Sequence, residues 1–118
     1  MSAENLLHEL EIQLEAAKRS VDLMHSLERL YKNNDFKALV LEGYLERESH
    51  RVVLLKADPN MQDENNSKNL DKIITGIGEF YQYLNRVEIL GKMSERAIME
   101  NSRVRQDILS GNFEEEEV

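Results

Sequence analysis

The stretch DFKALVLEGYLERESHRVVLLKADPN, residues 35–60, decides the fold of this chain. It fits either a two-stranded hairpin carried between two long helices or a third helix that ends before Pro59. A half-buried strand alternates apolar and polar residues, whereas residues 38–41 and 52–55 are apolar at consecutive positions. Residues 46–51, between these runs, contain no glycine, proline, asparagine or aspartate that could turn a hairpin. We therefore predict a helix over residues 36–56.

One apolar stripe follows this predicted helix at helical spacing. It consists of Ala38, Leu41, Leu45, Val52 and Leu55, with Glu48 as its only interruption. Gly43 costs roughly 1 kcal/mol relative to alanine in a helix interior, so it indicates a close crossing or a kink. Together with Tyr44, on a flanking stripe, it is predicted to press against another helix, a second copy or a partner. The helix is predicted to end near Lys56, because Pro59 cannot continue the hydrogen-bond ladder.

Residues 6–32 are predicted to form the first helix. Apolar residues recur there at spacings of three and four, which is a heptad seam; they are Leu7, Leu10, Leu14, Ala17, Val21 and Met24. The seam breaks at Glu28, where the apolar positions shift to Leu27, Leu30 and Tyr31. Residues 33–35 are predicted to stop this helix and to cap the next element.

Residues 58–69 are polar and predict a loop, after which Ser67 or Asn69 caps a long last helix over residues 69–109. Its seam consists of Leu70, Ile73, Ile77, Phe80, Leu84 and Val87, and continues more weakly through Gly91, Ser94, Ile98 and Ile108. Three glycines near the seam, Gly76, Gly78 and Gly91, indicate close helix–helix approach.

These elements predict an all-α fold: a three-helix antiparallel bundle, or a coiled-coil-like hairpin, with one long C-terminal helix. The prediction is a single helical domain over residues 1–110, followed by an acidic flexible tail at residues 111–118. Gly111 is a typical C-terminal stop for the last helix.

The composition excludes several classes of function. The chain of 118 residues has no cysteine, which excludes disulfides, zinc–thiolate sites and thiol catalysis. Its net charge of −8 disfavours direct binding to nucleic acid. Apolar runs are only a few residues long, so we expect no membrane association.

Candidate catalytic and metal sites are weak. His50 follows Glu46 at helical spacing, but di-iron bundles need Glu-x-x-His and a second matching pair. The loop that starts at Asp58 resembles a calcium loop superficially, yet Asp63 and Asn69 stand where such a loop needs Gly and Glu. There is no glycine-rich phosphate loop after a strand. We predict no cofactor, no metal and no enzymatic activity.

Two segments resemble a group of small helical proteins of tailed bacteriophages: NNDFKALVLEGYLERESHRVVLLKADPNMQ, residues 33–62, and IGEFYQYLNRVEILGKMSERAI, residues 77–98. The shared features are an Asn-x-Asp-Phe-Lys start, a Gly-Tyr-x-x-x-Glu middle and a Leu-x-Ala-Asp-Pro loop, and the likeness covers roughly residues 30–100. It implies a phage origin, with the host cytoplasm or the virion as the setting. No functional residue of this chain can be assigned from the resemblance.

The seams of the first and last helices are longer than a chain of this size readily buries, which predicts a homo-oligomer. Candidate interaction residues are Leu7, Leu10, Leu14, Val21, Met24, Gly43, Tyr44 and Phe113, the last being an apolar anchor in the acidic tail. The predicted function is a phage structural or assembly protein, namely a scaffold, chaperone or head-associated adaptor. Its partners would be itself and phage structural or host proteins.

Two alternatives stay open. One is an acidic helical inhibitor that binds a host nucleic-acid enzyme by phosphate mimicry, which the negative charge and the glutamates of residues 114–117 suggest. The other, a minor one, is a chaperone similar to prefoldin subunits, in which long N- and C-terminal heptad helices are joined by hairpins.

Overall fold

The computed structural model describes residues 2–111, and they form two compact units. The terminal unit consists of residues 2–25 and 87–111, and the central unit of residues 26–86. Within the described residues every regular element is a helix and none is a strand. The predicted all-α fold with one long C-terminal helix is confirmed. The single domain over residues 1–110 stays a prediction, and the acidic tail beyond Gly111 lies outside the described residues.

Helix α1 (Ala3–Lys32) begins three residues earlier than predicted because Ser2 caps it: the Ser2 Oγ accepts a hydrogen bond from the Asn5 backbone N–H at 3.1 Å. At the other end, Asn33 Oδ1 accepts from the Phe36 N–H at 2.9 Å and caps the short helix α2 (Asn34–Phe36). The predicted stop and cap at residues 33–35 are confirmed.

Residues 34–56 are helical throughout, so the decisive stretch is a helix and not a hairpin. After α2 come a π-helix, η1 (Lys37–Glu48), and the α-helix α3 (Ser49–Lys56). The predicted end is confirmed, because Ala57 and Asp58 close the last turn on the carbonyls of Leu54 and Leu55. A short 3-10 helix, η2 (Pro59–Met61), follows, and Asp58 Oδ1 caps it by accepting from the Asn60 N–H.

The π-helix differs from the α-helix that the sequence predicts. Its hydrogen bonds run from residue i to i+5, so each turn holds more residues and the apolar stripe shifts. Ala38, which α-helical spacing places on the stripe, is exposed, whereas Leu41 and Leu45 are half-buried and Val52 is fully buried. The predicted position of Ala38 is therefore wrong.

Helix α4 (Glu64–Ser110) begins five residues before the predicted start. Asp63 is its cap: the Asn66 backbone N–H donates to Asp63 Oδ2 at 3.1 Å, and the Asn66 side-chain amide donates to Oδ1 at 2.7 Å. The predicted caps, Ser67 and Asn69, are wrong, because residues 64–69 already form the first turns of the helix; these turns are mostly exposed, and a polar sequence is compatible with a helix there. Gly111 ends the helix with φ of 80°, as predicted.

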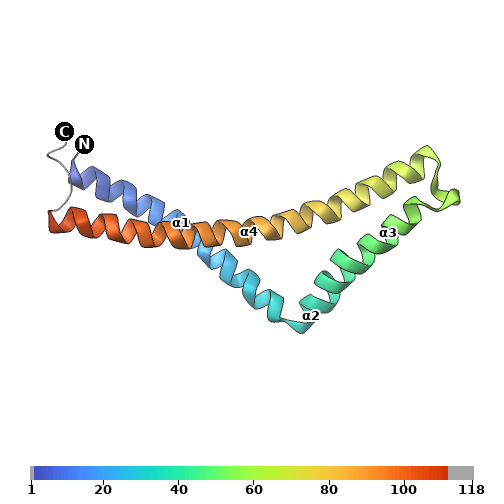
Figure 1. Ribbon diagram of the computed structural model, residues 1–118, viewed down its shortest axis with the longest axis horizontal. Coiled ribbons are helices and arrows are strands. Elements are labelled where there is room, and N and C mark those ends of the chain that lie inside the picture. Colours follow the sequence, from blue (N-terminus) through green and yellow to red (C-terminus); the bar gives the residue numbers. More distant parts are fainter. Residues whose placement is uncertain (1, 112–118) are drawn as a thin grey trace. The chain divides into compact units, whose positions relative to one another are not determined.

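The core of the central unit lies between antiparallel helices. Tyr44 in η1 packs edge-to-face on Phe80 in α4, and Lys56 in α3 forms an ion pair with Asp71 at 2.8 Å. The run from η1 to α3 therefore lies beside residues 64–86 of α4 (Figure 1). The buried apolar residues of this unit are Leu27, Val52, Leu70, Ile77 and Leu84, which confirms the seam predicted for the last helix and the shift to Leu27 in the first.

Candidate interaction surfaces

In the terminal unit, α1 and the C-terminal part of α4 lie side by side and antiparallel (Figure 1). Met24 is buried against Gly91, and a Cβ at residue 91 would overlap the Met24 side chain, including its Sδ at 2.6 Å. The absence of a side chain at Gly91 therefore lets the two helices approach, as the sequence predicted for this glycine.

A second contact fixes how α1 and α4 are aligned. The Asn101 side chain is only 8% exposed, and its Nδ2 donates to the backbone carbonyl of Leu10 at 2.9 Å. Asn101 was not among the residues predicted from the sequence to lie on an interaction surface. Its spacing could have indicated burial, because Asn101 occupies a heptad position of the predicted seam. The residues at this position, spaced seven apart, are Ile73, Phe80, Val87, Ser94, Asn101 and Ile108.

Most of the interaction residues predicted on α1 are only partly covered in this unit. Met24 is buried, but Leu7, Leu10, Leu14 and Val21 are half-buried. Along this part of α4 the covered residues include small or polar ones, Gly91, Ser94 and Asn101, as well as the apolar Ile98, Val104 and Ile108. Arg105 approaches Glu11 to only 4.0 Å. The apolar side chains of α1 thus lie beside a mixture of small, polar and apolar residues on α4.

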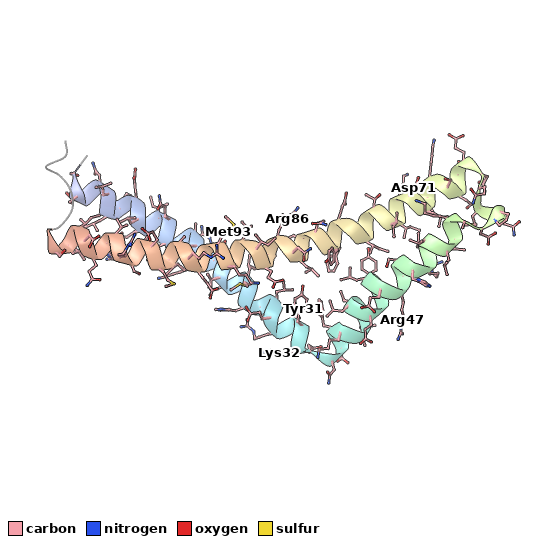
Figure 2. All side chains as sticks on the ribbon, in the orientation of Figure 1. Tyr31, Lys32, Arg47, Asp71, Arg86 and Met93 are labelled. Atoms are coloured by element: carbon pink, nitrogen blue, oxygen red, sulfur yellow. The ribbon has the colours of Figure 1, made fainter. Side chains whose placement is uncertain are left out.

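Other large apolar side chains of the terminal unit are more than a third exposed. They are Ile12 and Leu23 on α1, and Ile89, Leu90, Met93, Met99 and Leu109 on α4. Met93, labelled in Figure 2, is 57% exposed. Exposed apolar residues are common when they are scattered, but three of these, Ile89, Leu90 and Met93, lie within one helical turn of each other.

In the central unit, Gly43 and Tyr44 have different surroundings. The nearest atom to a Cβ built on Gly43 is the Ala38 carbonyl oxygen at 2.9 Å, which belongs to the same π-helix. Tyr44 packs on Phe80 with ring centroids 5.8 Å apart and remains 38% exposed. Gly43 therefore serves the conformation of η1 itself, while Tyr44 contacts another helix of the same chain.

Gly76 and Gly78 do not mark a close helix–helix approach, which corrects the prediction. A Cβ at either position would meet nothing within 4 Å. They flank Ile77, which faces the core, and neighbouring residues in a helix point in different directions. Gly78 instead lines a shallow groove on the solvent side of α4, together with Thr75, Glu79, Gln82 and Arg86.

The polar residues of both units form local pairs. Most of the ion pairs join residues three or four positions apart on one helix; these are Glu48–Arg51, Glu64–Lys68, Glu88–Lys92 and Glu100–Arg103. Such exposed pairs contribute little to stability. The hydrogen bond from Arg51 lowers the pKa of the Glu48 carboxyl below its usual value. Hydrogen bonds from Asn66 lower the pKa of Asp63 in the same way.

Among residues 2–111, no three His, Asp or Glu side chains come together in a group that could hold a metal ion. His50 is exposed on α3. None of the helices in the described part carries an apolar stretch of the length that a membrane span requires. Phe113, predicted to be an interaction residue, lies outside the described residues.

Comparison with known proteins finds no match: no protein family fits the chain, and neither a curated protein nor a solved structure is similar to it. The residues that the structure itself places together are therefore the basis of any functional proposal.

Proposed function

We propose that this protein is a non-enzymatic assembly protein that acts through helix–helix association, first of all with a second copy of itself. The observation that carries the proposal is the incomplete cover of α1. Leu7, Leu10 and Leu14 are only half-buried, and Ile12 and Leu23 on the same helix are more than half exposed. A further helix that packs on these residues of α1 would remove apolar surface from water. Such burial stabilises by roughly 25 cal/mol per Å² of apolar surface.

The resemblance to small tailed-phage proteins supports the setting of this proposal. It suggests a scaffold, a chaperone or a head-associated adaptor that works in the host cytoplasm or in the virion. Each of these roles requires association between helices and none requires a catalytic site.

The acidic inhibitor remains the second candidate because the net charge is −8. A phosphate mimic needs a continuous acidic face. The described helices instead intersperse acids with bases, as in the pairs Glu88–Lys92 and Glu100–Arg103. This local neutralisation favours the assembly protein. Recovery of a host polymerase or nuclease in a salt-sensitive pull-down would favour the inhibitor.

Association is tested by the molar mass in solution. The weight-average mass of the full chain, from light scattering after size exclusion, should rise above the 13.8 kDa of one chain as the concentration increases from micromolar to millimolar. Replacement of Leu14 by serine should lower the mass at a given concentration. The matched control is Leu39→Ser on η1, which is exposed and belongs to the central unit. A mass that stays at one chain throughout this range would reject the proposal.

The phage setting has its own test. Mass spectrometry of purified virions and of assembly intermediates should find the protein in at least one of them. Its absence from both would reject the assembly role even if the chain self-associates.

A further inference from the structure

The unusual element of the central unit is the π-helix η1, which extends over twelve residues. π-helices are rare and occur mostly as single turns inside α-helices, frequently at functional sites. A π-helix of this length therefore needs specific support from its side chains, and two residues give it.

Gly43 supports the π-helix by having no side chain. Its Cβ, if present, would lie 2.9 Å from the Ala38 carbonyl oxygen, closer than real Cβ atoms approach an oxygen. Ala38 is five residues earlier, which is the partner that a π-helix assigns to the Gly43 N–H. In an α-helix that N–H would bond to the carbonyl of Leu39 instead.

Ser49 supports the junction at which the π-helix becomes the α-helix α3. Its backbone N–H bonds to the Glu46 carbonyl, only three residues back. Its hydroxyl lies 2.5 Å from the Leu45 carbonyl oxygen and 2.9 Å from that of Glu46. The single proton of the hydroxyl can be donated to either of these carbonyl oxygens, of which that of Leu45 is the nearer, at the point where one hydrogen-bond pattern gives way to the other.

The same residues are also compatible with an α-helix. At α-helical spacing, Ala38, Leu41, Leu45, Val52 and Leu55 form one apolar stripe, and Glu48 interrupts it. In the π-helix Glu48 is instead only half-buried and forms an ion pair with Arg51. In the π-helix the Glu48 carboxylate thus stays in contact with water. In the α-helix Ala38 would lie on the buried apolar stripe, but so would Glu48. Each state has an advantage that the other lacks.

We propose that η1 is a conformational switch that exchanges between the π-helix and an α-helix over residues 37–48. In the α-helical state the Gly43 N–H moves from the Ala38 carbonyl to that of Leu39, and Ala38 turns toward the core. A partner that binds one of the two states more tightly than the other would shift their populations. The switch goes beyond the proposed self-association and does not depend on it.

Nuclear magnetic resonance can identify the partner of each amide directly, through scalar coupling across the hydrogen bond. In the isotope-labelled full chain, the Gly43 amide should couple to the Ala38 carbonyl carbon. Relaxation dispersion should show exchange on the microsecond-to-millisecond timescale over residues 37–48. In Gly43→Ala the coupling should move to Leu39 and the exchange should weaken. The reason is that a Cβ at residue 43 would clash with the Ala38 carbonyl oxygen in the π-helix, whereas alanine is well tolerated in an α-helix.

Gly78→Ala is the matched control, because a Cβ at residue 78 meets nothing. It should leave the couplings of residues 37–48 unchanged. A wild-type coupling from Gly43 to Leu39 alone, or a coupling to Ala38 without exchange, would overturn the switch. If Gly43→Ala fails to fold, Ser49→Ala tests the same equilibrium. It removes the hydroxyl that supports the π-helix, so the exchange should increase, and unchanged exchange would count against the proposal.

Discussion

The Asn101 side-chain amide donates to the backbone carbonyl of Leu10, across the seam between α4 and α1. A carbonyl oxygen has two lone pairs, so the Leu10 carbonyl can accept this bond in addition to the one within its own helix. A buried polar group must find a partner, and in this alignment of the two helices the Asn101 amide finds one in the Leu10 carbonyl. Asn101 therefore specifies how α1 and α4 align, as buried asparagines do in coiled coils.

The Asn101 contact should contribute measurably to stability. Asn101→Ala should lower the free energy of unfolding by about 1 kcal/mol relative to a control with the same change in helix propensity. Asn69→Ala is that control, because Asn69 is exposed on the same helix. Urea denaturation followed by circular dichroism measures both variants. Equal midpoints for the two would show that the hydrogen bond to Leu10 contributes nothing.

Glycines of α4 should respond oppositely to the same substitution. Gly91→Ala should destabilise by about 1–3 kcal/mol, since the new methyl group overlaps Met24. Gly78→Ala should stabilise by roughly 0.5–1 kcal/mol, because it gains helix propensity in open space. Thermal unfolding distinguishes the two. Met24→Ala should cost less in the Gly91→Ala background than in the wild type, and purely additive effects would contradict the contact.

Two adjacent valines of α3 provide another matched pair. Val52 is fully buried and Val53 is 54% exposed. Val52→Ala should cost about 2 kcal/mol, from lost burial and the cavity that remains. Val53→Ala should change stability by no more than about 0.5 kcal/mol. Chemical denaturation of the two variants checks the orientation of α3, and a larger effect at Val53 would mean that α3 faces the other way.

The Asp63 cap should make stability depend on pH. Hydrogen bonds from Asn66 lower the pKa of Asp63 in the folded state, so the unfolded chain binds the proton more tightly. The stabilisation is therefore present at neutral pH and is lost as the pH falls through and below about 4, the usual range of aspartate.

Asp63→Asn keeps an oxygen that can cap the helix but removes the titration. The stability difference between the wild type and Asp63→Asn should therefore shrink as the medium is acidified. Asp63→Ala, which has no cap, should be less stable than Asp63→Asn throughout. Urea midpoints measured across the acidic range test this, and a constant difference between wild type and Asp63→Asn would exclude the cap as the titrating group.

Much of the fold follows from local signals in the sequence. The asparagine cap at residue 33, the proline at residue 59 and the glycine at residue 111 mark real helix ends, because each acts through its own backbone chemistry. Heptad spacing placed Leu70, Ile77 and Leu84 in the core correctly. Gly91 was predicted to mark a close approach, and it does.

The features that were missed depend on tertiary context. Gly76 resembles Gly91 in sequence, but only Gly91 has a methionine opposite it. The predicted start of α4 is too late because residues 64–69 are all polar, so these first turns carry no apolar periodicity. Asn101 was overlooked because asparagine is ordinarily exposed, and only the carbonyl of Leu10 explains its burial. The π-helix has the same composition as an α-helix and cannot be distinguished by apolar spacing alone.

The short connection between α3 and α4 has a consequence for the order of folding. Gln62 donates its side-chain amide to the carbonyls of Lys56, at 2.6 Å, and Asp58, at 2.9 Å, so the connection satisfies its own backbone. Contacts across it close a small loop, whereas the Asn101–Leu10 contact spans 91 residues. Loop-closure entropy penalises the longer closure more. We therefore expect α3 and the start of α4 to pair early, and α1 to join α4 as a later event.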